Sequence, residues 1–80
     1  MVTPENVKHW IEEGLTGATA DVVGDGRHFE ATVVCSQFAG KSMLEQHRLV
    51  YTGLGSKMES AIHALSLRTY TPEQWQSIAS

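Results

Sequence analysis

The sequence predicts an α+β protein, a two-layer sandwich in which helices cover one face of a three-stranded mixed sheet. Apolar residues recur every three or four positions near the N-terminus and alternate with polar residues further on. Ser and Thr helix-start signals then precede three later segments. The predicted order is α-β-β-α-α-β-α, and strands joined through helices can lie parallel, with a right-handed crossover.

Length and composition limit the class of protein. Eighty residues suffice for one domain, residues 1–80, and 41% hydrophobic with 19% charged residues is typical of a globular chain. A net charge of -3 argues against a nucleic-acid binder held by charge alone. A single cysteine, no signal-peptide pattern and no long apolar run indicate a cytoplasmic protein without a membrane partner.

The first half of the chain predicts a helix and a hairpin. Thr3 is a favourable N-cap and Pro4 suits the first helical position, so the helix is expected over residues 4–15. Strands are expected over residues 18–23 and 29–35, around the turn at residues 24–26. Alternation places one set of side chains toward the first helix: Phe29, Ala31, Val33 and Cys35.

The second half repeats these signals. Ser42 and Glu45 have capping-box spacing, which predicts a helix over residues 42–54. Its inner face is expected to carry Met43, Leu44, His47, Val50, Tyr51 and Leu54, and its outer face Glu45, Gln46 and Arg48. Ser56 is expected to cap a short helix to about residue 62, before a strand over residues 64–70. Thr71 then precedes a terminal helix expected to dock through Trp75 and Ile78.

Catalytic and nucleotide-binding motifs are weak. Gly40-Lys41-Ser42 resembles the end of a phosphate-binding loop, but that motif needs a glycine where Cys35 stands. The parity of Cys35 predicts a buried, unreactive thiol. No nucleophile, base and acid pattern is present, so the protein is not expected to be an enzyme.

Four histidines are the remaining candidates. His9 is expected on the surface, and His47 partly buried on its helix. His28 closes the hairpin turn and His63 begins the third strand, where each is either an ordinary surface residue or a ligand. Two imidazoles alone do not fill a four-coordinate site, so a self-sufficient metal centre is not expected.

The chain resembles the BolA family. The resemblance rests on Phe38-Ala39-Gly40-Lys41, on His47-Arg48-Leu49-Val50, and on Ile62-His63-Ala64-Leu65 followed by Thr71-Pro72. It covers essentially the whole chain and is most similar to the bacterial IbaG/YrbA-like branch. It implies a fold like that of the class II KH domain, in agreement with the element order above.

The resemblance also implies a partner and a shared cofactor. BolA-like proteins pair with a monothiol glutaredoxin, and the pair bridges a 2Fe–2S cluster that the isolated chain does not hold. The glutaredoxin contributes its cysteine and a bound glutathione thiol. The BolA side contributes the histidine of the Ile-His-Ala-Leu motif, here His63, and a ligand from the hairpin, where His28 is the only soft-metal ligand.

A second activity implied by the family is DNA binding and transcription regulation through the KH-like surface. Lys41 and Arg48 are about two helical turns apart and are the candidates for phosphate contacts. The Gly-x-x-Gly loop of KH domains is absent, and the negative net charge predicts weak, salt-sensitive binding.

Overall fold

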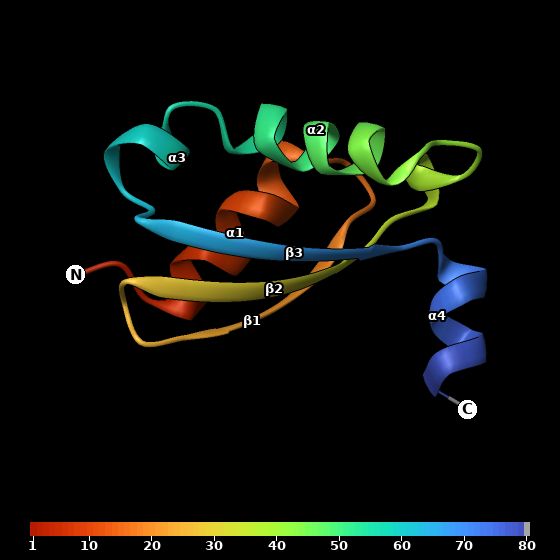
Figure 1. Ribbon diagram of the computed structural model, residues 1–80, viewed down its shortest axis with the longest axis horizontal. Coiled ribbons are helices and arrows are strands. Elements are labelled where there is room, and N and C mark those ends of the chain that lie inside the picture. The colour runs from red at the N-terminus through yellow and green to blue at the C-terminus, as the bar shows by residue number, and fades with distance from the viewer. Residues whose placement is uncertain (80) are drawn as a thin grey trace.

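The computed structural model describes residues 1–79 and has the predicted order of elements (Figure 1). None of the helices in this range is long and apolar enough to cross a bilayer. The elements are α1 (Pro4–Gly14), β1 (Thr19–Gly24), β2 (His28–Val34), a 3-10 turn (Ser36–Phe38), α2 (Met43–Leu54), α3 (Lys57–Ser60), β3 (Ala64–Tyr70) and α4 (Pro72–Ala79).

The sheet has the strand order β1-β2-β3 and is mixed. β1 pairs antiparallel with β2 through the hairpin, whereas β3 pairs parallel with β2 after the chain has passed through α2 and α3. The parallel register sets His28 opposite Ala64 and Val34 opposite Tyr70. The predicted mixed sheet is therefore confirmed, and both parallel strands begin at the same end of the sheet.

The core lies between the sheet and the helices. Phe29, Ala31 and Val33 of β2, with Cys35 just after it, are each no more than 1% exposed, which confirms the predicted parity. α1 adds the buried side chains Val7, Ile11 and, just past its end, Leu15. Burial of a large apolar side chain stabilises the fold by about 1.5–3 kcal/mol, so this shared core holds the sheet against α1.

Capping boxes begin α1 and α2. The spacing predicts the box at Ser42, whereas Thr3 is predicted only as an N-cap. The Thr3 hydroxyl accepts the Asn6 N–H at 3.1 Å, and the Asn6 side chain accepts the Thr3 N–H at 3.1 Å. The Ser42 hydroxyl accepts the Glu45 N–H at 3.2 Å, and the Glu45 carboxylate accepts the Ser42 N–H at 2.8 Å. Each box satisfies backbone donors that have no partner within the helix.

The prediction that the Ser56 side chain caps α3 is wrong. Ser56 has helical backbone angles, φ -67° and ψ -10°, and its hydroxyl makes no capping bond. Its carbonyl instead accepts N–H groups from Glu59 and Ser60 at 3.1 and 3.0 Å. A side-chain cap requires an extended backbone at the N-cap, and Ser56 is helical, so its hydroxyl does not cap α3. The helix also ends at Ser60, short of the predicted residue 62.

The predicted inner face of α2 is partly wrong. Gln46, expected in water, is 8% exposed, whereas Met43 is 72% and Leu44 is 61% exposed. The Gln46 amide donates to the carbonyls of Phe38 and Lys41 at 3.2 and 3.0 Å, and its oxygen accepts the Thr69 hydroxyl at 2.6 Å. These bonds satisfy the buried amide and join α2, β3 and the preceding loop.

The loop before α2 contributes a core residue that the sequence pattern did not identify. Phe38 is completely buried, although residues 37–41 were expected only to interrupt the strand. The 3-10 turn directs this ring inward, and Phe38 O accepts the Lys41 N–H at 3.1 Å. A single aromatic in an irregular segment has no periodicity from which its burial follows.

The terminal helix docks only in part as predicted, through Trp75 and not through Ile78. All residues of α4 are exposed, with Ile78 at 59% and Trp75 at 39%. The Trp75 ring lies 5.5 Å from the Tyr70 ring, and the Thr71 hydroxyl accepts the Gln74 N–H at 3.2 Å. Figure 1 shows α4 projecting at the end of the sheet, and Ile78 borders only an open depression with Thr69 and Tyr70 of β3.

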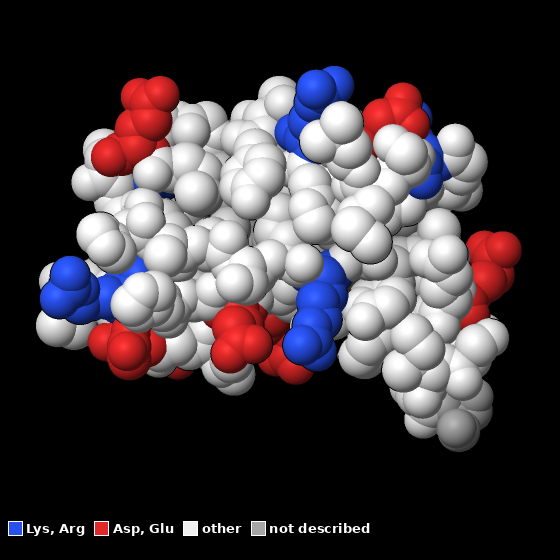
Figure 2. Space-filling model, viewed as in Figure 1, with Lys and Arg blue, Asp and Glu red and all other residues white. Residues whose placement is uncertain are grey.

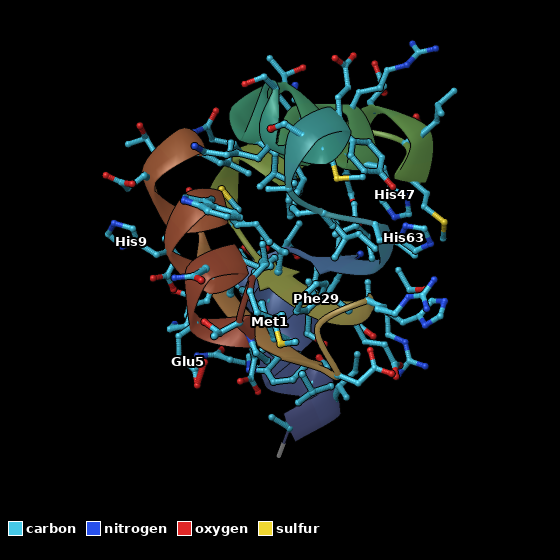
Figure 3. All side chains as sticks on the ribbon, turned by 90° about the vertical axis from the view of Figure 1, so that its left-hand side faces the viewer. Met1, Glu5, His9, Phe29, His47 and His63 are labelled. Atoms are coloured by element: carbon cyan, nitrogen blue, oxygen red, sulfur yellow. The ribbon has the colours of Figure 1, made fainter. Side chains whose placement is uncertain are left out.

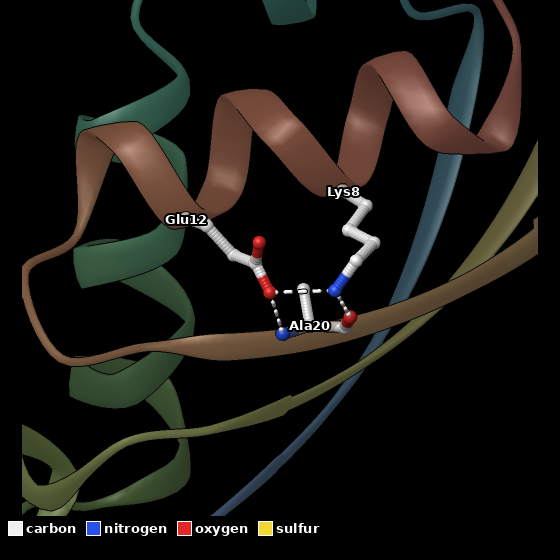
Figure 4. A network of polar contacts seen from close by, with 3 residues as sticks. All are labelled: Lys8, Glu12 and Ala20. Carbon is white, nitrogen blue, oxygen red and sulfur yellow. Dashed lines mark hydrogen bonds and ion pairs between the residues drawn. The ribbon is translucent and has the colours of Figure 1, made fainter.

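An ion pair on α1 bonds the backbone of one residue, Ala20, at the outer edge of β1 (Figure 4). Lys8 and Glu12 are 2.7 Å apart. Lys8 also donates to the Ala20 carbonyl at 2.8 Å, and Glu12 accepts the Ala20 N–H at 3.0 Å. The backbone groups of Ala20 that point away from β2 are therefore satisfied by side chains of α1.

These contacts make stability depend on pH in a defined direction. The Lys8 ammonium, followed by the Ala20 N–H, holds the pKa of Glu12 below its ordinary value. A lowered folded-state pKa contributes stability above the unfolded pKa of about 4.3, and this contribution is lost as the pH falls through the folded value. We expect Glu12→Gln to lower stability by about 1 kcal/mol or less at neutral pH.

The difference in Tm between wild type and Glu12→Gln should shrink when thermal unfolding is followed from about pH 6 to about pH 3. Glu5→Gln, on the exposed first turn of α1, is the matched control and should not show this convergence. A Tm difference between wild type and Glu12→Gln that stays constant in acid would contradict the stabilising role of the ionised Glu12 carboxylate.

Candidate metal centre

The parallel register brings His28 and His63 together. His28 begins β2, opposite Ala64, and His63 directly precedes Ala64 on the neighbouring strand. The Ala64 N–H donates to the Arg27 carbonyl at 3.0 Å, which fixes the two chain segments beside each other. The imidazole centroids are 6.1 Å apart with planes at 79°, and both side chains are exposed. Two nitrogen donors therefore share one end of the sheet.

The hairpin holds the backbone of His28 in place. The Asp25 carboxylate accepts the N–H groups of Arg27 and His28, each at 2.9 Å, and the Asp25 N–H donates to the His28 carbonyl at 3.2 Å. The N–H of His28, and then that of Arg27, hold the pKa of Asp25 below its ordinary value. The turn is fixed while the imidazole extends into solvent.

His63 is held by its neighbours in the chain. Ile62 before it is 3% exposed, and the Ile62 N–H donates to the Lys57 carbonyl at 2.9 Å. Ala64 after it is bonded to the hairpin as described. A residue between a buried side chain and a ladder hydrogen bond has a restricted backbone, which positions its side chain at the surface.

No third soft-metal donor joins this pair within the described residues. His9 pairs with Glu13 at 3.0 Å on α1, and Figure 3 shows its ring on the opposite side of the molecule from His63. His47 is half-buried on α2. Cys35 is 1% exposed, with its sulfur 3.6 Å from the Thr16 carbonyl, which confirms the predicted buried thiol. Within residues 1–79, no three His, Cys, Asp or Glu side chains form a metal cluster.

The donor set fits half of a coordination sphere. Two exposed imidazoles match the nitrogen-ligated iron of a mixed-ligand 2Fe–2S cluster, whose other iron takes two thiolates. The buried Cys35 is not available as a thiolate at this surface. Sulfur ligands would thus come from a second molecule.

The second predicted site is also assembled, in a modified form. Lys41 and Arg48 line one shallow depression on α2 with Glu45 between them. The Ser42 N–H, and further the charges of Lys41 and Arg48, hold the pKa of Glu45 below its ordinary value. An ionised carboxylate thus offsets the two cations and occupies the N–H that a phosphate would use at this helix start.

Sequence reasoning missed two residues that position these sites. The sequence pattern identifies Asp25 only as part of the hairpin turn. An Asp carboxylate that accepts the N–H of the residue two positions later, here Arg27, is the pattern of an Asx turn. The sequence pattern places Gln46 on the solvent-exposed face of its helix because the amide side chain is polar. No periodicity distinguishes a buried, fully bonded glutamine from a solvated one.

Residues 5–74 match the sequence profile described as BolA-like protein. The chain belongs to the BolA-like family. It is 41% identical to Protein BOLA2 of Arabidopsis thaliana over 95% of this chain and 86% of that protein. It is 34% identical to the DNA-binding transcriptional regulator BolA of Escherichia coli over 69% of this chain, and that match spans 52% of the regulator. The chain thus spans about half the length of several curated relatives.

Solved BolA-like structures share the whole fold. A BolA homologue from Coxiella burnetii has a TM-score of 0.92 and 53% identity over 95% of this chain and 99% of that one. Yeast Fra2 has a TM-score of 0.70 and 30% identity, over 98% of this chain and 88% of Fra2. The BolA-like sandwich with its mixed sheet is therefore the fold of this chain, as the sequence predicts.

Proposed function

We propose that this BolA-like chain is a non-enzymatic adaptor that binds a monothiol glutaredoxin and shares a bridging 2Fe–2S cluster. Its role would be in iron–sulfur cluster trafficking or in iron and stress regulation. The observation that carries the proposal is the exposed His28–His63 pair, with ring centroids 6.1 Å apart.

The missing ligands define the partner. Two imidazoles without a third donor need two external thiolates, and the family resemblance assigns these to the glutaredoxin cysteine and its bound glutathione. Nitrogen ligation of one iron raises the reduction potential relative to an all-thiolate cluster. When bound, the cluster would supply electron-transfer or cluster-transfer chemistry, and this chain would contribute the two imidazoles and the surface around them.

Reconstitution tests the proposal. The chain, a monothiol glutaredoxin, glutathione, iron and sulfide are combined anaerobically, and visible absorption and circular dichroism are recorded on the purified heterodimer. We expect a spectrum that differs from that of the glutaredoxin homodimer and one cluster per heterodimer. A heterodimer that carries no cluster, or a spectrum identical to that of glutaredoxin alone, would reject the proposal.

The alternative function is DNA binding. Two observations favour it as a second candidate: Lys41 and Arg48 line one depression, and one relative is a DNA-binding transcriptional regulator. The interleaved Glu45 and the net charge of -3 both weaken attraction to phosphate. Any affinity should therefore be low and sensitive to salt.

A charge-removing substitution tests this surface. Glu45→Gln keeps the capping-box pattern and removes the carboxylate between the two cations, so we expect duplex DNA affinity at low salt to rise about threefold or more. Lys41→Ala with Arg48→Ala should weaken the binding and lower the dependence of the affinity on salt by about two phosphate contacts. Fluorescence anisotropy at two salt concentrations measures both. If none of the three substitutions changes the affinity for duplex DNA, this surface is not the DNA-binding site.

A further inference from the structure

The two imidazoles of the candidate metal centre are only part of the surface that a partner protein needs. A stable interface buries about 800 Å² on each partner. His28 and His63 lie at one end of the sheet, so a glutaredoxin that reaches them must also cover a surface beside them. Figure 3 shows His9 of α1 on the opposite side of the molecule from His63, which excludes the outer face of α1. The open face of the sheet and the outer flank of α2 remain.

The open face of the sheet is charged. It carries the strand residues that alternate with the buried ones, and Asp21, Glu30 and Arg68 line one depression on it. The register sets Asp21 opposite Thr32 and Thr32 opposite Arg68, so the charges reach across all three strands. Figure 2 shows acidic and basic side chains along the lower part of the molecule, where Figure 1 places β1 and β2. Because interface cores are depleted of charged residues, this face is the poorer docking surface.

The outer flank of α2 is formed by Leu44, His47 and Tyr51 and contains no Lys, Arg, Asp or Glu. These three residues are three and four positions apart, so they share one side of the helix. Figure 3 shows His47 on the side away from α1 and on the same side of the molecule as His63. Leu44 is 61% and Tyr51 is 38% exposed. Large apolar side chains therefore face solvent on the side of the molecule that carries His63.

The charged residues of α2 lie elsewhere on the helix. Glu45 and Arg48 line a separate depression with Lys41. Figure 2 shows that the described residues form an uncharged band across the front of the molecule, between charged side chains at its upper rim and those of the sheet below. Exposed apolar side chains gathered in this way indicate an interaction surface, and tyrosine is enriched in interface cores. The outer flank of α2 thus has the composition that the open sheet face lacks.

The surface of α3 joins the outer flank of α2 to the metal centre. Figure 1 shows α3 between the end of α2 and the start of β3. Residues 58–63 line one hollow there, which includes His63. The Lys57 ammonium lies outside this hollow, 5.0 Å from the centroid of the Trp10 ring on α1. Within the described part of the chain, Glu59 is the one acidic or basic residue that lines the hollow, so a mostly uncharged surface leads to His63.

We propose that a monothiol glutaredoxin docks on the outer flank of α2 and brings its cluster ligands to His28 and His63 from there. The inference rests on the function proposed above and assigns the surface that this function uses. The partner presents an apolar face beside its cluster-ligating cysteine, and this face covers Leu44 and Tyr51. Since little charge is buried, the affinity should depend only weakly on salt, in contrast to DNA binding.

Matched arginine substitutions test the docking surface. Leu44 of α2 and Val23 of β1 are both 61% exposed, and Val23 lines the depression on the open sheet face. Calorimetry of the full chain with a monothiol glutaredoxin and glutathione, without iron, gives the dissociation constant of the heterodimer. We expect Leu44→Arg to raise this constant about tenfold or more, because it places a cation in an apolar contact. Val23→Arg should leave it within about twofold of wild type, since the partner does not cover the open sheet face.

A second variant and a second measurement complete the test. Tyr51→Ala removes an aromatic anchor and should raise the dissociation constant about tenfold. Leu and Arg have similar helix propensities, so Leu44→Arg should keep the fold, which far-ultraviolet circular dichroism verifies for all variants. In the reconstituted heterodimer, both α2 variants should lose the visible circular dichroism of the cluster faster than wild type and Val23→Arg.

The outcomes separate this inference from the function on which it rests. If wild type binds glutaredoxin and carries the cluster, but Leu44→Arg weakens binding no more than Val23→Arg, the α2 surface is wrong and the proposed function stands. A larger effect of Val23→Arg would also overturn the inference and assign the contact to the open sheet face. A wild type that binds glutaredoxin neither with nor without a cluster would reject both.

Discussion

Replacing His63 by alanine is expected to remove the shared cluster while the chain remains folded and still binds glutaredoxin. The side chain is exposed, so its loss costs little stability. It is one of the two imidazoles that lie together at this end of the sheet, with ring centroids 6.1 Å apart, so its loss leaves one iron short of a ligand. Changes to residues that merely orient a ligand cost about 10–100-fold in metal affinity, and loss of the ligand should cost at least as much.

Visible circular dichroism of the reconstituted heterodimer measures the loss, and calorimetry without iron measures partner binding separately. His9→Ala is the matched control, since His9 is also exposed but pairs with Glu13 on α1. His28→Ala should resemble His63→Ala. His63→Cys should retain a cluster at lower potential, because sulfur replaces nitrogen on one iron. A full cluster spectrum in His63→Ala would remove this residue from the coordination sphere.

The largest expected effect on stability comes from Gly14→Ala. A Cβ at Gly14 would lie 2.1 Å from the Gly53 carbonyl oxygen and 2.5 Å from its carbon, so the backbones of α1 and α2 must separate. The two helices share the buried core of Val7, Ile11 and Val50. Overpacking of this kind costs about 3 kcal/mol, which corresponds to a Tm lower by about 15 °C in a domain of this size.

Helix propensity alone predicts the opposite sign, because alanine in a helix is favoured over glycine by about 1 kcal/mol. Thr52→Ala is the matched control, on the exposed side of α2 beside Gly53, and should leave the Tm nearly unchanged. Gly53→Ala should destabilise less than Gly14→Ala, because its added Cβ meets the Gly14 oxygen at 2.7 Å. A Gly14→Ala protein as stable as wild type would mean that the crossing of α1 and α2 adjusts freely.

The candidate metal centre shows how far local patterns reach. The sequence pointed to His63 through its motif and to His28 as the one soft donor of the hairpin. Their separation depends on the pairing of β2 with β3, and 34 residues of chain lie between the two histidines. The Asp25 turn that fixes His28 was not inferred as a positioning contact, because its effect depends on which N–H groups fold back toward the carboxylate.

The chain's own sequence determined the order of elements, the caps of α1 and α2, and the buried face of β2. Each of these depends on residues within a few positions of one another, where backbone geometry and periodicity decide the outcome. Tertiary structure alone decided that Gln46 is buried, that Met43 and Leu44 are exposed, and that Ile78 of α4 stays exposed. These outcomes depend on which element packs opposite each side chain. A side chain is buried only when a second element covers it, and the local sequence describes only the element that carries the side chain.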